Sequence, residues 1–264
     1  MPASRRPAMA GHHRRHRLAV VVAGILVAVI GAAAIIGWPA RHAAPGAAGR
    51  AGQARSIPPS GAAASPPGAA GSPSAPGQLP SIDLAGLGWT DFHGVELPVS
   101  RFAGPRDVRH GLASGFADSP LGALLAAVNI GVRANAQWGP GIFGPTIRNQ
   151  VTGPGTAALL SACTASYDQA SRASGMPAGQ PLGRAYVAEE AFRWVAYTPA
   201  GATVDIVSAG PGTDGVTVRA VTRIEVAWSG RDWRVIAPPG GDWGNSAAPL
   251  TSLSGYTILP NPAA

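Results

Sequence analysis

The sequence predicts one transmembrane helix followed by an α+β extracytoplasmic domain in which two helices pack on a curved antiparallel sheet. Three observations support this fold class. Residues 18–38 are apolar and uncharged, residues 118–175 repeat apolar side chains at helical spacing, and residues 184–237 alternate apolar and polar side chains as strands do. A run of helices followed by a run of strands is typical of α+β domains.

The apolar run of residues 18–38 is long enough to cross a hydrocarbon core of about 30 Å at about 1.5 Å per residue. Five arginines and three histidines precede it in residues 1–17, whereas the first 15 residues after it hold only Arg41 and Arg50. Because basic residues favour the cytoplasmic side, we expect a single-pass protein of the cell membrane with a cytoplasmic N-terminus and an extracytoplasmic C-terminal domain.

Two alternatives stay open for this helix. Cleavage as a signal peptide is one, although the apolar core is longer than usual and no A-x-A site follows it. Self-association is the other, because Gly24, Ala28 and Ala32 form a small-xxx-small pattern on one face. The second alternative would make the protein a homo-oligomer.

Residues 39–80 contain nine prolines and almost no aliphatic side chain larger than alanine. Such a segment cannot bury enough apolar surface to offset the entropy of ordering, so we expect a disordered tether. If extended at about 3.1 Å per residue, it would let the outer domain work well away from the bilayer.

The basic excess of the chain lies in its N-terminal part. All 20 basic residues are arginine, and eight of them precede residue 83, where there is no acid; the remainder holds 12 arginines against 13 acids. A nucleic-acid-binding domain would carry its positive charge on a folded face, so we expect no nucleic acid binding by the outer domain. The basic tail is suited to anionic lipid headgroups.

Within residues 81–264 we expect an extended entry strap at 81–117, helices in 118–175, a sheet in 184–237 and a Pro-rich C-terminal strap at 238–264. The first helix begins at the capping residue Ser119 and ends near Ala136; the second runs from about Thr156 to Gly175. The sheet is a four-stranded meander with hairpin loops at 199–201 and 229–231. Its strand at 216–228 is too long to stay flat and must curl or carry a bulge.

The hairpin with Trp228 and Trp233 resembles the nuclear-transport-factor-like cone fold. The layout of basic tail, single span, tether and cone resembles the bitopic assembly proteins of type IV secretion and conjugation systems. The segment 119–129 (SPLGALLAAVN), the Trp-x4-Trp hairpin and the late Leu253-Ser-Gly-Tyr256 resemble an actinobacterial membrane-anchored family associated with integrative conjugative elements. The resemblance covers about residues 89–259 and implies no catalytic residues.

Chemical signatures are sparse. The single cysteine, Cys163, is expected to be a small buried apolar residue, since no histidine lies near it in the sequence. There is no CxxC, HExxH or His/Cys cluster, so we predict no metal, cofactor or catalytic residues.

Two classes of function follow. The first is a non-enzymatic component of a bacterial conjugation or secretion apparatus that assembles with envelope proteins through its outer domain. The second is an envelope ligand-binding or enzymatic cone with a pocket at the open end of the sheet, whose candidate residues are Glu189, Glu190 and Asp205 with Tyr186 or Tyr197.

Two considerations bear on the second class. Neighbouring residues of a strand point to opposite faces, so at most one of Glu189 and Glu190 can face inward. Ion pairs with Arg184 or Arg193 are the simpler role for these acids, whereas a buried carboxylate with a strongly shifted pKa in a sizeable pocket would favour the second class.

Overall fold

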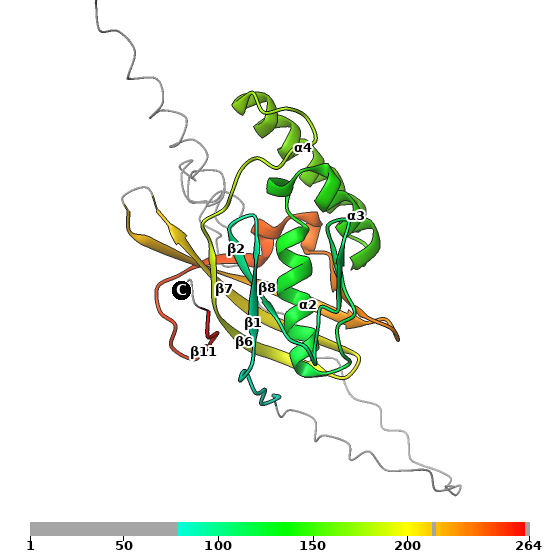
Figure 1. Ribbon diagram of the computed structural model, residues 1–264, viewed down its shortest axis with the longest axis vertical. Helices are drawn as coiled ribbons and strands as arrows, with labels where there is room; N and C mark the ends of the chain where they lie inside the picture. Colours follow the sequence, from blue (N-terminus) through cyan, green and yellow to red (C-terminus); the bar gives the residue numbers. More distant parts are fainter. Residues whose placement is uncertain (1–78, 213–214, 262–264) are drawn as a thin grey trace, which may run out of the picture. The chain divides into compact units, whose positions relative to one another are not determined.

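The computed structural model describes residues 79–212 and 215–261 (Figure 1). The basic tail, the apolar run of residues 18–38 and all but the last two residues of the predicted tether lie outside the described residues, so those predictions stay predictions. None of the helices that the structure describes is long and apolar enough to span a bilayer. The described part is an α+β fold with three α-helices and a curled mixed sheet.

The predicted four-stranded meander is confirmed. It consists of four antiparallel strands joined by short hairpin loops: β6 (Ala188–Thr198), β7 (Gly201–Pro211), β8 (Thr217–Trp228) and β9 (Trp233–Ile236). The whole sheet is larger and has nine described strands in the order β1-β2-β6-β7-β8-β9-β5, with β10 beside β8 and β11 beside β6. The added strands are β1 (Gly88–Phe92), β2 (Val95–Val99), β5 (Val151–Thr152), β10 (Ala247–Leu250) and β11 (Thr257–Ile258). The contacts of β2 with β6 and of β5 (Val151–Thr152) with β9 are parallel.

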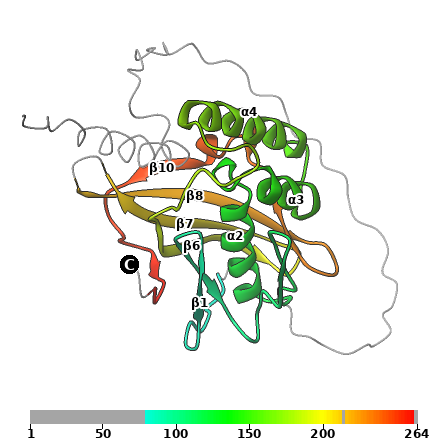
Figure 2. The same cartoon turned by 45° about the horizontal axis from the view of Figure 1, so that its top comes forward.

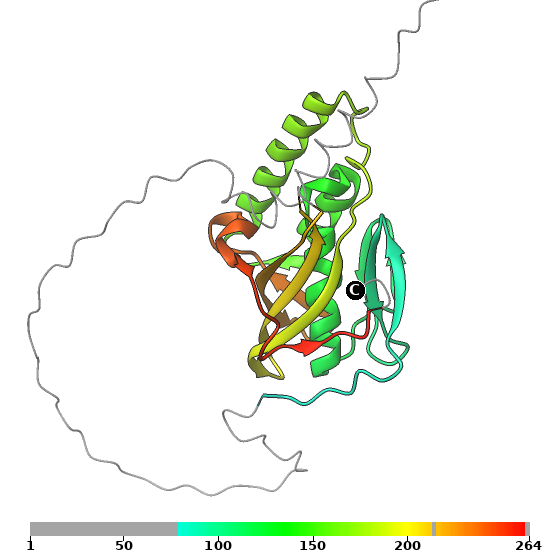
Figure 3. The ribbon, with the colours of Figure 1, turned by 90° about the vertical axis from the view of Figure 1, so that its left-hand side faces the viewer.

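The sheet curls, as expected (Figure 3), but the bulges lie in β6 and not in the long strand at 216–228. β8 pairs with β7 without a break, whereas β6 shifts register against β7 between Glu189 and Ala191 and again between Trp194 and Ala196. Each extra residue increases the local twist of β6, so the sheet can curl while β7 and β8 stay fully paired.

The first and last helices agree with the sequence. α2 (Pro120–Arg133) begins at Ser119, whose hydroxyl accepts a hydrogen bond from the Gly122 amide at 3.1 Å, and is buried nearly all round. It ends earlier than expected, and a short 3-10 turn (Ala136–Trp138) follows. α4 (Thr156–Ser174) ends at Gly175 in the left-handed conformation, as predicted.

A third helix, α3 (Pro140–Gln150), was missed, so the prediction of two helices is wrong. The segment contains two prolines and two glycines, which made it look like a loop. Pro140 occupies the first turn, where a missing N–H is tolerated, whereas Pro145 lies in the middle of the helix and removes one helical hydrogen bond. Burial of Phe143 and Ile147, one turn apart, stabilises the helix against that cost.

The predicted entry strap at 81–117 is also wrong, because this segment forms two hairpins. They are β1 (Gly88–Phe92) with β2 (Val95–Val99), and β3 (Asp107–Arg109) with β4 (Leu112–Ser114). Both turns are His-Gly pairs, His93-Gly94 and His110-Gly111, in which both residues have positive φ. Tight hairpin turns require that backbone conformation, and Asn or Asp before Gly is its usual signal.

The sheet curls around α2, which lies between the long strands and the β1–β2 hairpin (Figure 3). Asn129 joins α2 to β2, since its side-chain amide donates to the Pro98 carbonyl at 2.9 Å. Trp233 and Val235 are buried against α2, as expected of the inward face of β9. α3 and α4 pack on each other beyond the C-terminal end of α2 (Figure 2).

The C-terminal segment is more ordered than an extended strap. It contains two short 3-10 turns (Pro239–Gly241 and Trp243–Ser246) and two short strands, β10 (Ala247–Leu250) and β11 (Thr257–Ile258). β10 pairs with β8 and β11 pairs with β6. This segment therefore runs from one side of the meander to the other.

Candidate functional site

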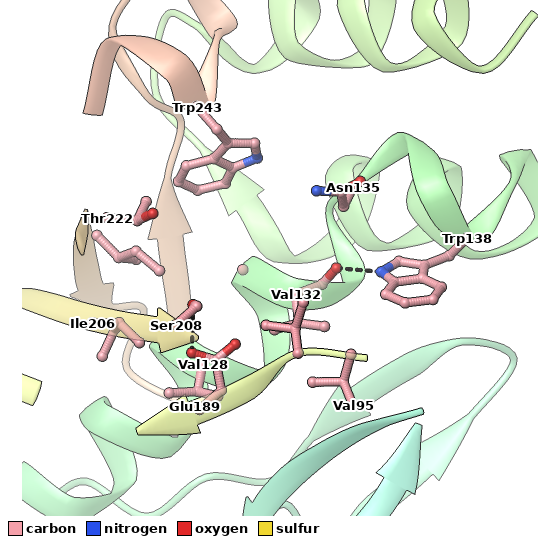
Figure 4. Close-up of a pocket in the computed structure, with 13 residues that line it drawn as sticks. Val95, Val128, Val132, Asn135, Trp138, Glu189, Ile206, Ser208, Thr222 and Trp243 are labelled. Atoms are coloured by element: carbon pink, nitrogen blue, oxygen red, sulfur yellow. Dashed lines mark hydrogen bonds between the residues drawn. The ribbon is translucent and has the colours of Figure 1, made fainter. Parts of the chain in front are cut away.

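A cavity of about 80 Å³ lies at the C-terminal end of α2, where that helix faces β6, β7 and β8 (Figure 4). Six aliphatic side chains and two tryptophans form most of its wall: Val95, Val128, Val132, Val187, Ile206, Ile224, Trp138 and Trp243. Four polar side chains also border it: Asn135, Glu189, Ser208 and Thr222. An apolar pocket with a few converging polar groups is the usual form of a small-molecule site.

Glu189 is the one titratable side chain among the described residues that line this cavity. It is only 4% exposed, and the Ser208 hydroxyl donates a hydrogen bond of 2.8 Å to its Oε2 atom. No described residue donates to Oε1, and no described cation pairs with the carboxylate. The carboxyl group lies between Ser208 and Val132 (Figure 4).

The environment of Glu189 favours its protonated form. Burial raises the pKa of this carboxyl to about 7, although the hydrogen bond from Ser208 works in the opposite direction. The group therefore changes charge near neutral pH. Glu189 is thus a buried carboxyl group with a shifted pKa, as expected of a ligand-binding or enzymatic cone, but its cavity of about 80 Å³ is smaller than the sizeable pocket of that expectation.

Backbone pairing fixes the position of Glu189. It lies directly opposite Ser208 in the β6–β7 ladder, next to the register shift that displaces Glu190. The carbonyl of Glu189 accepts from the Asn261 amide side chain at 3.1 Å, and the carbonyl of Glu190 accepts from the Leu259 N–H at 2.9 Å. The C-terminal segment thus holds the strand that carries the carboxylate.

The two tryptophans present rings rather than N–H groups to the cavity. The Trp138 indole donates to the Val132 carbonyl at 2.6 Å, and the Trp243 indole donates to the Ala134 carbonyl at 3.1 Å. Both acceptors lie at the C-terminal end of α2, where carbonyls lack helical partners. These bonds fix the two rings, and the Trp138 ring also stacks on the His93 ring with 5.5 Å between their centroids.

The other proposed carboxylates lie on the opposite face of the sheet in ion pairs. Asp205 accepts hydrogen bonds from Arg193 at 2.7 Å and from Arg223 at 2.8 Å. Burial alone would raise the pKa of Asp205, but these two bonds outweigh it and hold the pKa below its ordinary value. Glu190 pairs with Arg219, whose Nη2 lies 2.8 Å from Oε1.

Ion pairing is therefore confirmed for Glu190 and Asp205, and the predicted partner Arg193 is confirmed for Asp205, whereas the buried Glu189 has no ion pair among the described residues. Arg184 instead pairs with Asp91 at 2.7 Å. Tyr186 is 72% exposed, and the Tyr197 ring contacts Trp194 rather than the cavity. The structure brings none of the other candidates to Glu189.

A larger hollow of about 590 Å³ borders the ion pairs on this opposite face. Arg193, Asp205 and Arg223 line one side of it, and residues 236–240 and 245–248 line the other. Trp243 borders both this hollow and the cavity around Glu189. Trp243 is therefore part of the wall of both the cavity and the larger hollow.

The prediction for Cys163 is confirmed, since the thiol is buried and burial raises its pKa to about 11. Such a thiol is not a ready nucleophile. Among the described residues, no group of three or more His, Cys, Asp or Glu side chains could hold a metal ion.

A curled sheet wrapped around one helix, with a cavity at the end of that helix, defines the chain as an α+β domain with an interior pocket. The chain belongs to the family described as domain of unknown function DUF8175, whose model matches residues 49–258. No curated protein and no solved structure matches the chain.

Sequence reasoning named Glu189 but missed the other polar residues of the cavity. Ser208 continues the inward series of Val204 and Ile206 on β7, so the alternation could have identified it. Thr222 lies opposite Ile206 on β8 and could have been found in the same way. Asn135 and Trp243 come from turns, and no periodic pattern predicts their direction.

Proposed function

We propose that the described domain binds a small ligand in the cavity around Glu189 and forms the outer part of a single-pass envelope protein. The observation that carries the proposal is the buried carboxyl group that lines an apolar cavity and leaves one oxygen without a protein partner. A buried polar group of this kind normally has a hydrogen-bond partner, and a ligand would supply it.

Binding is favoured over catalysis by the composition of the cavity. Its described lining residues offer one carboxyl group, two hydroxyl groups and one carboxamide, without a second base that could orient Glu189. The domain is also proposed to belong among nuclear-transport-factor-like cones, because a curled sheet around a helix with a pocket at one end is the arrangement expected of that fold.

A fragment screen tests the ligand-binding proposal. Small cationic, neutral and anionic compounds would be added to the full-length protein in detergent, and the unfolding temperature followed by tryptophan fluorescence. Some fragments should raise the unfolding temperature of the wild-type protein but not of Thr222→Phe, which fills the cavity. Thr217→Phe, on the exposed side of the same strand, is the control and should respond like the wild type.

The proposal fails if no fragment raises the unfolding temperature, or if Thr222→Phe responds as strongly as Thr217→Phe. The second result would mean that the fragments bind elsewhere on the protein.

A second candidate function is non-enzymatic assembly within a bacterial conjugation or secretion apparatus, at the cell membrane and with envelope proteins as partners. The sequence features of residues 1–80 and the family resemblance motivate it. One structural observation supports it: Tyr186, Val216 and Val218 are exposed apolar side chains, and they lie close together around the β7–β8 hairpin tip. Substitution of all three by Ser should abolish capture of envelope proteins without lowering the unfolding temperature.

A further inference from the structure

We propose that the occupant of the cavity is a primary ammonium group on a short alkyl chain, held by the free oxygen of Glu189 with its alkyl part against the aliphatic and tryptophan wall. The inference rests on the ligand-binding role proposed above and names the chemistry of the ligand. The structure contributes three observations to it: a missing counter-charge, an apolar and aromatic wall, and a restricted volume.

The first observation is that the Glu189 carboxylate has no positively charged partner among the described residues. Two carboxylates on the opposite face of the sheet are buried or half-buried and have arginine partners: Glu190 pairs with Arg219, and Asp205 pairs with Arg193 and Arg223. Glu189 is more deeply buried than Glu190 and has only the neutral Ser208 hydroxyl. Because a buried carboxylate without a cation is costly, a cationic ligand group would gain more here than a neutral one.

The wall of the cavity indicates what surrounds the cationic group. Inorganic cations require several oxygen ligands, whereas most of this surface is aliphatic. An alkyl chain gains free energy by leaving water for such a surface. The ring of Trp243 favours an organic cation further, since an ammonium group is attracted to the face of an indole.

The volume limits the size of the inserted group. A cavity of about 150 Å³ accommodates benzene, and a single water needs at least about 10 to 15 Å³. At about 80 Å³ the cavity around Glu189 suits a group of roughly three to five non-hydrogen atoms. A propylammonium ion has this size, and so does the end of a lysine side chain.

The polar groups opposite Glu189 suit an ammonium ion, which donates three hydrogen bonds and accepts none. Glu189 Oε1 provides one charged acceptor. The Thr222 hydroxyl borders the same space and contains an acceptor oxygen, whereas the Asn135 Oδ1 atom already accepts from the Gln137 N–H at 3.0 Å. One charged acceptor beside a neutral hydroxyl suits a cationic donor, whereas the Glu189 carboxylate would repel a carboxylate or phosphate ligand.

Calorimetric titration of the full-length protein in detergent at pH 8 tests this inference. The probes are propylammonium, 1-propanol and propionate, which share a chain length and differ in charge. Propylammonium should bind and propionate should not. Glu189→Gln should weaken propylammonium binding by about tenfold or more, as expected for the loss of a buried charge-assisted hydrogen bond. Glu190→Gln, one residue along and on the other face, should change it by less than about twofold.

The results distinguish failure of the ammonium inference from failure of the ligand-binding proposal. If 1-propanol binds and Glu189→Gln leaves every affinity unchanged, the ammonium inference is overturned while the cavity remains a ligand site. If no probe binds and the fragment screen is also negative, the cavity holds only water and both proposals fail. Tighter binding of Nα-acetyl-lysine amide than of propylammonium would support the inference and assign a peptide lysine as the source.

Discussion

Glu189 and Ser208 lie directly opposite each other on β6 and β7, and the Ser208 hydroxyl donates to the carboxylate across 2.8 Å. This hydrogen bond favours the ionised form of Glu189, while burial favours the protonated form and dominates. The contact therefore joins a neutral donor to an acid whose charge depends on pH near neutrality.

The free energy of unfolding should fall as pH rises from about 4.5 to 7. In this interval the unfolded state has released the Glu189 proton and the folded state retains it, since the folded pKa is about 7. At about 1.4 kcal/mol per pKa unit, the loss is on the order of 3 kcal/mol and is complete above pH 7. Thermal unfolding of Glu189→Gln should lack this fall, because the amide does not ionise.

Glu190→Gln serves as the control for the pH dependence. It removes a carboxylate from the same strand but leaves Glu189 in place, so the decline between pH 4.5 and 7 should persist. Equal pH dependence in wild type and Glu189→Gln would show that another group is responsible.

Trp233→Ala should lower the free energy of unfolding by about 3 to 5 kcal/mol, because it removes a large buried ring. The residue is 1% exposed, and its indole N–H donates to the Ala117 carbonyl at 2.9 Å. For a domain of this size the change corresponds to a decrease of about 6 to 20 °C in unfolding temperature. Arg234→Ala, at the exposed neighbouring position, should change it by no more than about 2 °C.

Asp205→Asn should destabilise the protein by about 1 to 3 kcal/mol, since the carboxylate is buried and accepts from two arginines. The matched control is Asp91→Asn, which breaks the exposed pair with Arg184 and should cost at most about 1 kcal/mol. The unfolding temperatures of the two variants provide the comparison. If Asp91→Asn cost as much as Asp205→Asn, burial would not be what gives the Asp205 pair its strength.

The membrane topology is tested by fusions to the C-terminus of the full-length protein. The arginine bias around residues 18–38 predicts that an alkaline phosphatase fusion is active and a green fluorescent protein fusion in the same place is dark. Moving Arg14, Arg15 and Arg17 to the other side of the apolar run should reduce the phosphatase activity. A bright fluorescent fusion with an inactive phosphatase would place the domain in the cytoplasm.

The sequence predicted the regular elements of the fold best. α2, α4 and the meander each repeat apolar side chains with one period over ten or more residues, and their ends carry ordinary caps and turns. The sequence did not predict α3, because its two prolines and two glycines are typical of a loop and the apolar pair Phe143 and Ile147 is too short a pattern to outweigh them. The sequence did not predict the β1–β2 and β3–β4 hairpins, because their turns have histidine at the position where asparagine is usual.

The sequence predicted only part of the candidate site. Alternation established that Glu189 and Glu190 could not both face inward, and the structure shows Glu189 inside. The register shift in β6 decides which of the two glutamates faces inward. This shift is set by pairing with β7 and cannot be read from the sequence of β6 alone. Trp138 and Trp243 could not be anticipated because tertiary hydrogen bonds to the end of α2 orient them.

The placement of β10 and β11 has a consequence for the order of folding. β10 pairs with β8, β11 pairs with β6, and the two strands lie at residues 247–250 and 257–258. A nascent chain that has reached residue 240 can already form the meander of β6, β7, β8 and β9. The stretches of β8 and β6 that later pair with β10 and β11 still expose unpaired N–H and C=O groups. Such open edges invite strands of other molecules. The interval between synthesis of β9 and arrival of β11 is therefore the stage at which this domain is most exposed to aggregation.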